Sequence, residues 1–125
     1  MNYSDLTWRR FASAAFAGVL AGPTVRRGAA GSRRQGTWVQ FDVQVGSGNQ
    51  DATVAAVRFL AFGCPHVIAA SDWVAEAALG RHAQPLLPEP VQALRERFDV
   101  PVEKLGRLLV IEDAWISALS SPYRP

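Results

Sequence analysis

The sequence has one cysteine, Cys64, and one lysine, Lys104, among its 125 residues. A single cysteine cannot form a disulfide within the chain, so nothing indicates an oxidising compartment. No apolar run reaches the roughly 18 to 20 residues that a membrane-spanning helix requires. The three glycines Gly28, Gly31 and Gly36 are not followed by the Gly-Lys-Ser/Thr ending of a phosphate-binding loop. These absences argue against a disulfide-stabilised secreted domain, a membrane span and a P-loop nucleotide site.

The composition is that of an ordinary globular protein, with 49% apolar and 19% charged residues. The length fits a single domain over residues 1–125. Up to Gln35 the chain has six arginines and one acid, Asp5, whereas the rest is mildly acidic. Such a basic region can contact phosphate. Because no nucleic-acid motif is present and the aromatics are not interleaved with the arginines, we expect a solvated surface and no nucleic-acid partner.

Two interpretations compete for the segment WRRFASAAFAGVLAG at residues 8–22. Paired arginines before an alanine-rich segment resemble an export signal. However, Ser4 followed by Asp5 is a natural helix start. Four apolar residues then recur at near-helical spacing: Leu6, Phe11, Ala15 and Val19. We favour an amphipathic helix without a membrane partner, and with it a cytoplasmic protein.

The middle of the chain predicts strands. Residues 22–36 lack periodicity and are rich in glycine and arginine, which indicates a flexible loop with at most a short strand near Thr24 and Val25. Residues 37–45 alternate, which is typical of a half-buried antiparallel strand. Its two sides are Val39, Phe41, Val43 and Val45, and Gln40, Asp42 and Gln44. A turn at 46–51 and a second strand at 54–62 follow.

The second half of the chain predicts helices near 65–79, 90–98 and 102–119. Pro65 suits the first helical position, which makes Cys64 the N-cap, and Gly80 is a plausible stop. One side of the last helix is expected to carry Leu105, Leu108, Leu109, Ile116 and Leu119. The tryptophans at 8, 38, 73 and 115 are expected in the core or an interface. With no repeated βαβ unit, the fold class is α+β, with about three antiparallel strands packed against helices on one face.

The segment FGCPHVIAAS at residues 62–71 resembles the helix-opening cysteine motif of the IscU and NifU N-terminal family, the scaffolds of iron–sulfur cluster assembly. Its matches to the pattern F-G-C-x-x-x-I-A-x-S are Phe62, Gly63, Cys64, Ile68, Ala69 and Ser71. The opening YSD and the segment KLGRLLVIEDAWISAL at 104–119 are similar to the family's start and final helix. The resemblance covers nearly the whole chain. It implies the IscU/NifU fold, which is related to that of SufE.

The resemblance also implies where a cluster would be held. Scaffolds of this family use three cysteines, an aspartate near the first and sometimes a histidine before the third. Here Cys64 is retained, while Gln35 and Arg107 occupy the other cysteine positions. Thr37 and Gly106 occupy the aspartate and histidine positions. The chaperone motif Leu-Pro-Pro-Val-Lys is represented by VPVEK at 100–104.

The expected function is therefore that of a scaffold-like, bacterial-like iron–sulfur assembly protein that is not an enzyme. The resemblance implies iron binding, with an iron–sulfur cluster or zinc as cofactor and a cysteine desulfurase or chaperone as partner; a homo-oligomer is an open possibility. Cys64 and His66 are the candidate metal ligands. Asp72 and His82 are not placed to complete a tetrahedral site with them.

One cysteine cannot supply the four ligands that an iron–sulfur cluster usually takes. Arg107 would repel a metal cation but stabilise a thiolate at Cys64, as a helix N-terminus also does. The alternative is therefore a metal-free, diverged member with Cys64 as a sulfur (persulfide) acceptor, or a protein-binding adaptor. We expect little iron or zinc in the isolated protein and a pKa of Cys64 below the usual ~8.5. An inert, buried Cys64 is the structural alternative.

Overall fold

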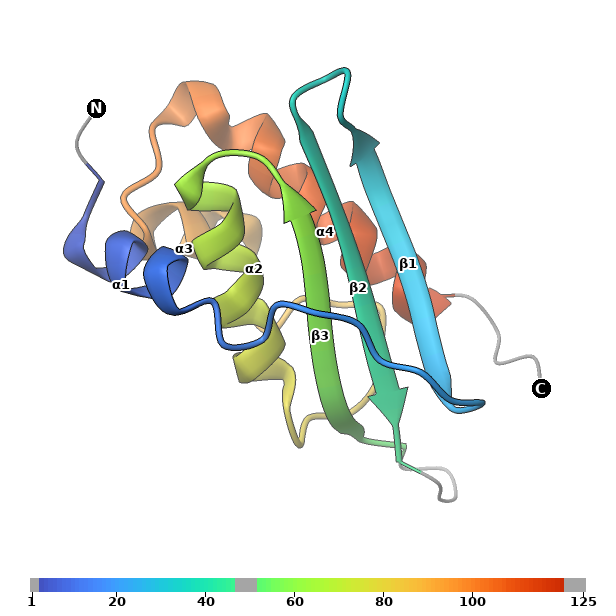
Figure 1. Cartoon of the computed structure of the whole chain (residues 1–125). Coiled ribbons are helices and arrows are strands. Elements are labelled where there is room, and N and C mark those ends of the chain that lie inside the picture. Colours follow the sequence, from blue (N-terminus) through green and yellow to red (C-terminus); the bar gives the residue numbers. More distant parts are fainter. Residues whose placement is uncertain (1–2, 47–51, 121–125) are drawn as a thin grey trace.

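The computed structural model describes residues 3–46 and 52–120 (Figure 1). Its elements, in order, are α1 (Asp5–Ser13), β1 (Val25–Ser32), β2 (Thr37–Val45), β3 (Val54–Phe62), α2 (Pro65–Ala78), α3 (Val91–Arg97), the 3₁₀ turn η1 (Val102–Lys104) and α4 (Leu105–Ser120). The strands form one antiparallel sheet in the order β1-β2-β3. The predicted α+β class, the two predicted strands and the three later helices are confirmed.

The core lies between the sheet and the helices. β2 is the central strand, and its apolar side is fully buried at Val39, Phe41 and Val43. α4 packs against β1 and β2, while α2 packs against β3 (Figure 1). The ring of Trp115 meets that of Phe41 edge-on at 5.3 Å, and its indole N–H donates to the Leu86 carbonyl at 3.0 Å. Burial of this face of the sheet is the main source of stability.

The predicted loop at 22–36 is wrong for residues 25–32, which form β1 along the full length of β2. Glycine and arginine are poor strand signals, and they obscured the strand. The small residues have a packing role here. A Cβ on Gly28 would lie 2.1 Å from the backbone nitrogen of Ala118, so glycine is required where α4 crosses β1.

The segment between α1 and β1 crosses the face of the sheet opposite the helices (Figure 1). It first pairs with the outer edge of β3, where Gly18 N–H donates to the Phe59 carbonyl at 2.8 Å. α1 ends at Ser13, so the helix predicted to continue through Ala15 and Val19 is wrong beyond that point. Ala14, at φ 36°, is the left-handed residue that ends α1.

Asp42 was predicted to face solvent, but it is fully buried. Its carboxylate accepts the Leu20 N–H at 2.9 Å and pairs with Arg27 Nε at 2.7 Å. The crossing segment therefore covers the outward side of β2, and the buried charge is paired and hydrogen-bonded, as burial of a carboxylate requires.

The expected apolar side of the last helix needs correction. Leu109 and Ile116 are 44% and 37% exposed, because only one side of α4 meets the sheet, whereas Leu108 and Leu119 are buried. Of the tryptophans expected in the core or an interface, Trp115 lies in the core, while Trp8 is 47% exposed. Most of the predicted turn at 46–51 lies outside the described residues. No helix in the described part of the chain is long and apolar enough to span a membrane.

Candidate functional site

Cys64 lies at the junction between β3 and α2. It is the N-cap of α2, with extended backbone angles of φ −83° and ψ 168°, and Pro65 begins the helix. Pro65 fits there because the first helical N–H has no intrahelical partner. The side chain of Cys64 is partly buried, and the thiol is not in a disulfide. The helix start predicted from Gly63, Cys64 and Pro65 is thus the one that the structure contains.

The surroundings of Cys64 favour its thiolate. Burial raises the pKa of the thiol. The backbone N–H of Val67, the guanidinium of Arg107 and the backbone N–H of His66 together lower this pKa by more than burial raises it. The net result is a pKa below the ordinary value. The neutral thiol makes no capping hydrogen bond, so these groups act mainly on the charged form. Arg107, at a position where the resemblance implied a ligand cysteine, thus acts on the one thiol of the chain.

His66 is poorly suited to join Cys64 as a metal ligand. Its side chain is 3% exposed, and its Nδ1 lies 3.5 Å from the Nζ of Lys104. Burial, together with the charges of Lys104 and Arg107, lowers the pKa of His66 to about 4, so the ring is neutral at pH 7. With Nδ1 accepting from the ammonium, the ring proton resides on Nε2. In this tautomer neither nitrogen offers a lone pair to a metal.

A pocket of about 230 Å³ opens beside Arg107, where the β1–β2 turn meets the start of α4. Its lining residues are Gln35, Thr37, Glu103, Gly106, Arg107 and Val110. These include all four positions that the resemblance had assigned to the family's other ligands. Residues about 70 positions apart in sequence therefore converge as the resemblance implied, although none of the four offers a thiolate, imidazole or carboxylate.

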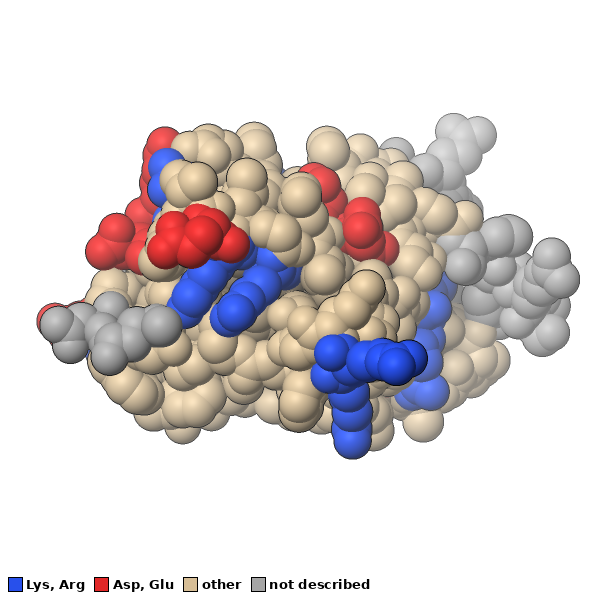
Figure 2. Space-filling model, turned by 90° about the horizontal axis from the view of Figure 1, so that it is seen from above, with Lys and Arg blue, Asp and Glu red and all other residues tan. Residues whose placement is uncertain are grey.

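Figure 2 views the molecule from the end at which the β1–β2 turn and the first turns of α2 and α4 lie. Basic side chains gather at this end, with acidic ones beside them. Within residues 3–46 and 52–120, no three His, Cys, Asp or Glu side chains converge on a point. The donor set around Cys64 therefore does not fit a resident iron–sulfur cluster or zinc ion.

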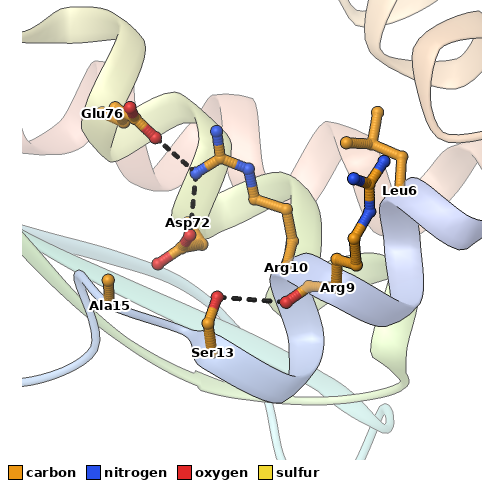
Figure 3. A pocket seen from close by; sticks show the side chains of 7 residues that line it. All are labelled: Leu6, Arg9, Arg10, Ser13, Ala15, Asp72 and Glu76. Carbon is orange, nitrogen blue, oxygen red and sulfur yellow. Dashed lines mark hydrogen bonds and ion pairs between the residues drawn. The ribbon is translucent and has the colours of Figure 1, made fainter.

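A second pocket, of about 330 Å³, lies between α1 and α2 (Figure 3). Arg10 pairs there with Asp72 at 2.9 Å and with Glu76 at 2.7 Å. Asp72 also accepts the Phe16 N–H at 2.8 Å, and its side chain is 1% exposed. Asp72 thus joins α1 to α2 and does not face Cys64, while His82 is exposed next to Thr53, before β3. Sequence reasoning missed the Arg10–Asp72 pair, since no local pattern links residues so far apart.

The chain is a member of the NifU-like N terminal domain family, whose sequence model matches residues 2–119. A crystal structure of a proposed iron–sulfur cluster assembly scaffold protein for the SUF system, from Fervidobacterium islandicum AW-1, superposes with a TM-score of 0.68 at 13% identity. The match covers 94% of this chain and 96% of that one, and it confirms the fold.

A crystal structure of a hypothetical protein matches with a TM-score of 0.47 and 20% identity, over 95% of this chain and 85% of that one. No curated protein matches the sequence.

Proposed function

We propose that this protein serves iron–sulfur cluster assembly as a single-cysteine sulfur carrier. The observation that carries the proposal is the guanidinium of Arg107, which acts on the thiol of Cys64. The resemblance implies a ligand cysteine at the position of Arg107. A fixed cation at this position opposes a metal ion and stabilises a sulfur anion. The carrier is not an enzyme; it acts in the cytoplasm, with a cysteine desulfurase as donor and a chaperone or scaffold as further partner.

The transfer requires one activated thiolate. Cys64 attacks the outer sulfur of the donor's persulfide, and the donor's S–S bond breaks. The electron pair of that bond leaves with the donor's cysteine as a thiolate, and Cys64 becomes the persulfide. No external oxidant or reductant is consumed. Arg107, which favours the thiolate before transfer, also faces the anionic sulfur afterwards.

The scaffold function, which family membership favours, is the second candidate. A cluster carried as cargo would need ligands beyond Cys64, supplied by a second subunit or by small thiols. Anaerobic reconstitution with iron and sulfide, followed by metal analysis and a visible spectrum, separates the two functions. We expect less than stoichiometric iron in the chain. A stable cluster that is lost in Cys64→Ser would replace the carrier with the scaffold.

The direct test of the carrier is the reactivity of Cys64. The alkylation rate of the native protein should show an inflection below the ordinary pKa of cysteine, and Arg107→Ala should move it upward. Arg34→Ala is the matched control, because it removes the same charge from the β1–β2 turn, where Arg34 is exposed. Incubation with a cysteine desulfurase and cysteine should add one sulfur atom to Cys64, by mass spectrometry. A thiol that reacts only in denaturant would contradict the proposal.

A further inference from the structure

The outer face of the sheet, which lies opposite the helices, is covered over only half of its length. The crossing segment pairs with the edge of β3 at Phe59 and then lies over Asp42, to which the Leu20 N–H donates. In Figure 1 no described element lies in front of the other half of this face, next to the β1–β2 turn. That half of the sheet therefore has no partner among residues 3–46 and 52–120.

The strand register identifies the side chains of this open half. Side chains alternate along a strand, so Trp38 and Gln40 point to the same side as Asp42, away from the core. Residues directly opposite in the ladder share a side, and on β3 Phe62 pairs with Trp38 and Leu60 with Gln40. Together with their partners on β1, the residues of the open half are Ala29, Gly31, Trp38, Gln40, Leu60 and Phe62.

Three of these residues form an apolar cluster on the surface. Phe62 is 44% exposed, Leu60 is 37% exposed, and Trp38 is partly exposed. Adjacent exposed apolar side chains of this size are typical of an interaction site, whereas single ones are ordinary on a protein surface. Aromatic residues and arginine are also the residue types enriched in the cores of protein interfaces.

The rim of the apolar cluster is basic. The three strands and the β1–β2 turn contain five arginines, at 26, 27, 33, 34 and 58, and one acid, Asp42, which is buried and paired with Arg27. The guanidinium of Arg33 lies over the ring of Phe62, 5.6 Å from its centroid, and Arg34 is exposed in the same turn. Neither Arg33 nor Arg34 pairs with a carboxylate in the described part of the chain. The sheet and its turn thus offer positive charge and no exposed acid.

This charge selects among the possible occupants. A second copy of the chain, docked face to face, would bring the arginines of the two copies together, which is unfavourable. Single-stranded nucleic acid needs free aromatic faces on which bases can stack, but the ring of Phe62 already carries Arg33. A protein surface with an apolar centre and acidic side chains around it complements both the cluster and its rim.

We infer that the open half of the sheet is a docking site for a partner protein whose contact surface has an apolar centre and an acidic rim. Phe62 and Leu60 contact the apolar centre, and Arg33 and Arg34 contact the acids. Because Phe62 comes two residues before Cys64, a protein docked here lies at the end of the sheet that leads to the thiol. The inference does not require the proposed carrier function, since it concerns binding alone.

The test selects random displayed peptides on the full chain and measures the affinity of the enriched peptides. We expect these peptides to combine apolar residues with Asp and Glu, and their Kd to rise at least about tenfold in Phe62→Ala. Leu109→Ala is the matched control, because Leu109 is also 44% exposed but lies on α4, on the other side of the sheet. Leu60→Ala is a second test of the same cluster if Phe62→Ala fails to fold.

Reversal of charge tests the rim. Arg33→Glu should weaken binding of the acidic peptides, whereas Arg81→Glu, an exposed position beyond the end of α2, should leave it unchanged. Enriched peptides that bind equally to wild type, Phe62→Ala and Arg33→Glu would overturn the inference. A dimer in sedimentation equilibrium that Phe62→Ala dissociates would overturn it in favour of a second copy. Binding of oligouridylate that both variants abolish would overturn it in favour of RNA.

Discussion

Replacement of Asp42 by asparagine tests whether the buried carboxylate holds the crossing segment on the sheet. The carboxylate accepts two hydrogen bonds from Arg27, at 2.7 and 2.9 Å, and one from the Leu20 N–H at 2.9 Å. Breaking a fully buried ion pair costs about 3–5 kcal/mol. In Asp42→Asn the cost is smaller, because Arg27 is 54% exposed and its guanidinium can be hydrated. The side-chain oxygen of the asparagine can also still accept the Leu20 N–H. The expected loss in the free energy of unfolding is therefore about 2 kcal/mol, close to one charged hydrogen bond.

This loss should depend on pH. Burial raises the pKa of Asp42, but the hydrogen bond from Arg27, the Leu20 N–H and the charge of Arg27 outweigh it, so the folded-state pKa is lowered. Because folding lowers the pKa of Asp42, the stability that its ionised carboxylate contributes is complete above the unfolded-state pKa of 3.8. This stability is lost as the pH falls through the folded-state pKa. Urea unfolding of wild type and Asp42→Asn should therefore differ most at neutral pH and converge in acid.

The matched control is Asp113→Asn, the same chemical change at an exposed position of α4. It should change the free energy of unfolding by less than about 0.5 kcal/mol. A loss in Asp42→Asn as small as that of the control, or one independent of pH, would refute the role assigned to Asp42. Faster hydrogen exchange at the Leu20 amide in Asp42→Asn would locate the effect in the crossing segment.

Two other perturbations follow from the packing and the charges. Gly28→Ala should destabilise the fold by at least about 1–3 kcal/mol in thermal or urea unfolding, because the added Cβ would lie 2.1 Å from the backbone of α4. Gly106→Ala is the comparison: Gly106 lies on α4, and a Cβ there would meet no atom within 4 Å. This second substitution should stabilise the fold by up to about 1 kcal/mol. Equal effects of the two would contradict the close contact of α4 and β1. The pKa of His66 lies at about 4 in the folded state, so wild type should lose stability as the pH falls from about 6.5 to 4, by up to about 3 kcal/mol. His66→Gln should lack this slope in urea unfolding, and a slope that persists would assign it to other groups.

Local patterns were sufficient for the elements that have strong signals. The alternation over 37–45 predicted β2, and Pro65 after Cys64 predicted the start of α2, since both depend on short-range sterics and periodicity. β1 was missed, because its glycines carry no strand signal until α4 lies against Gly28. Leu109 and Ile116 were placed on the apolar side of the last helix but are exposed, because helical spacing alone does not say how much of a helix surface the rest of the fold covers.

The sequence by itself determined the fold class, the lone thiol and its place at a helix start, because these follow from composition and from neighbouring residues. Only the tertiary structure decided that the guanidinium of Arg107 acts on that thiol. Arg107, Thr37 and Gln35 meet in one pocket because the β1–β2 turn packs against the start of α4. In the same way, Asp42 is buried because a segment some 20 residues earlier crosses the sheet above it. Burial and electrostatic environment depend on contacts between distant parts of the chain, and such contacts have no local signature in the sequence.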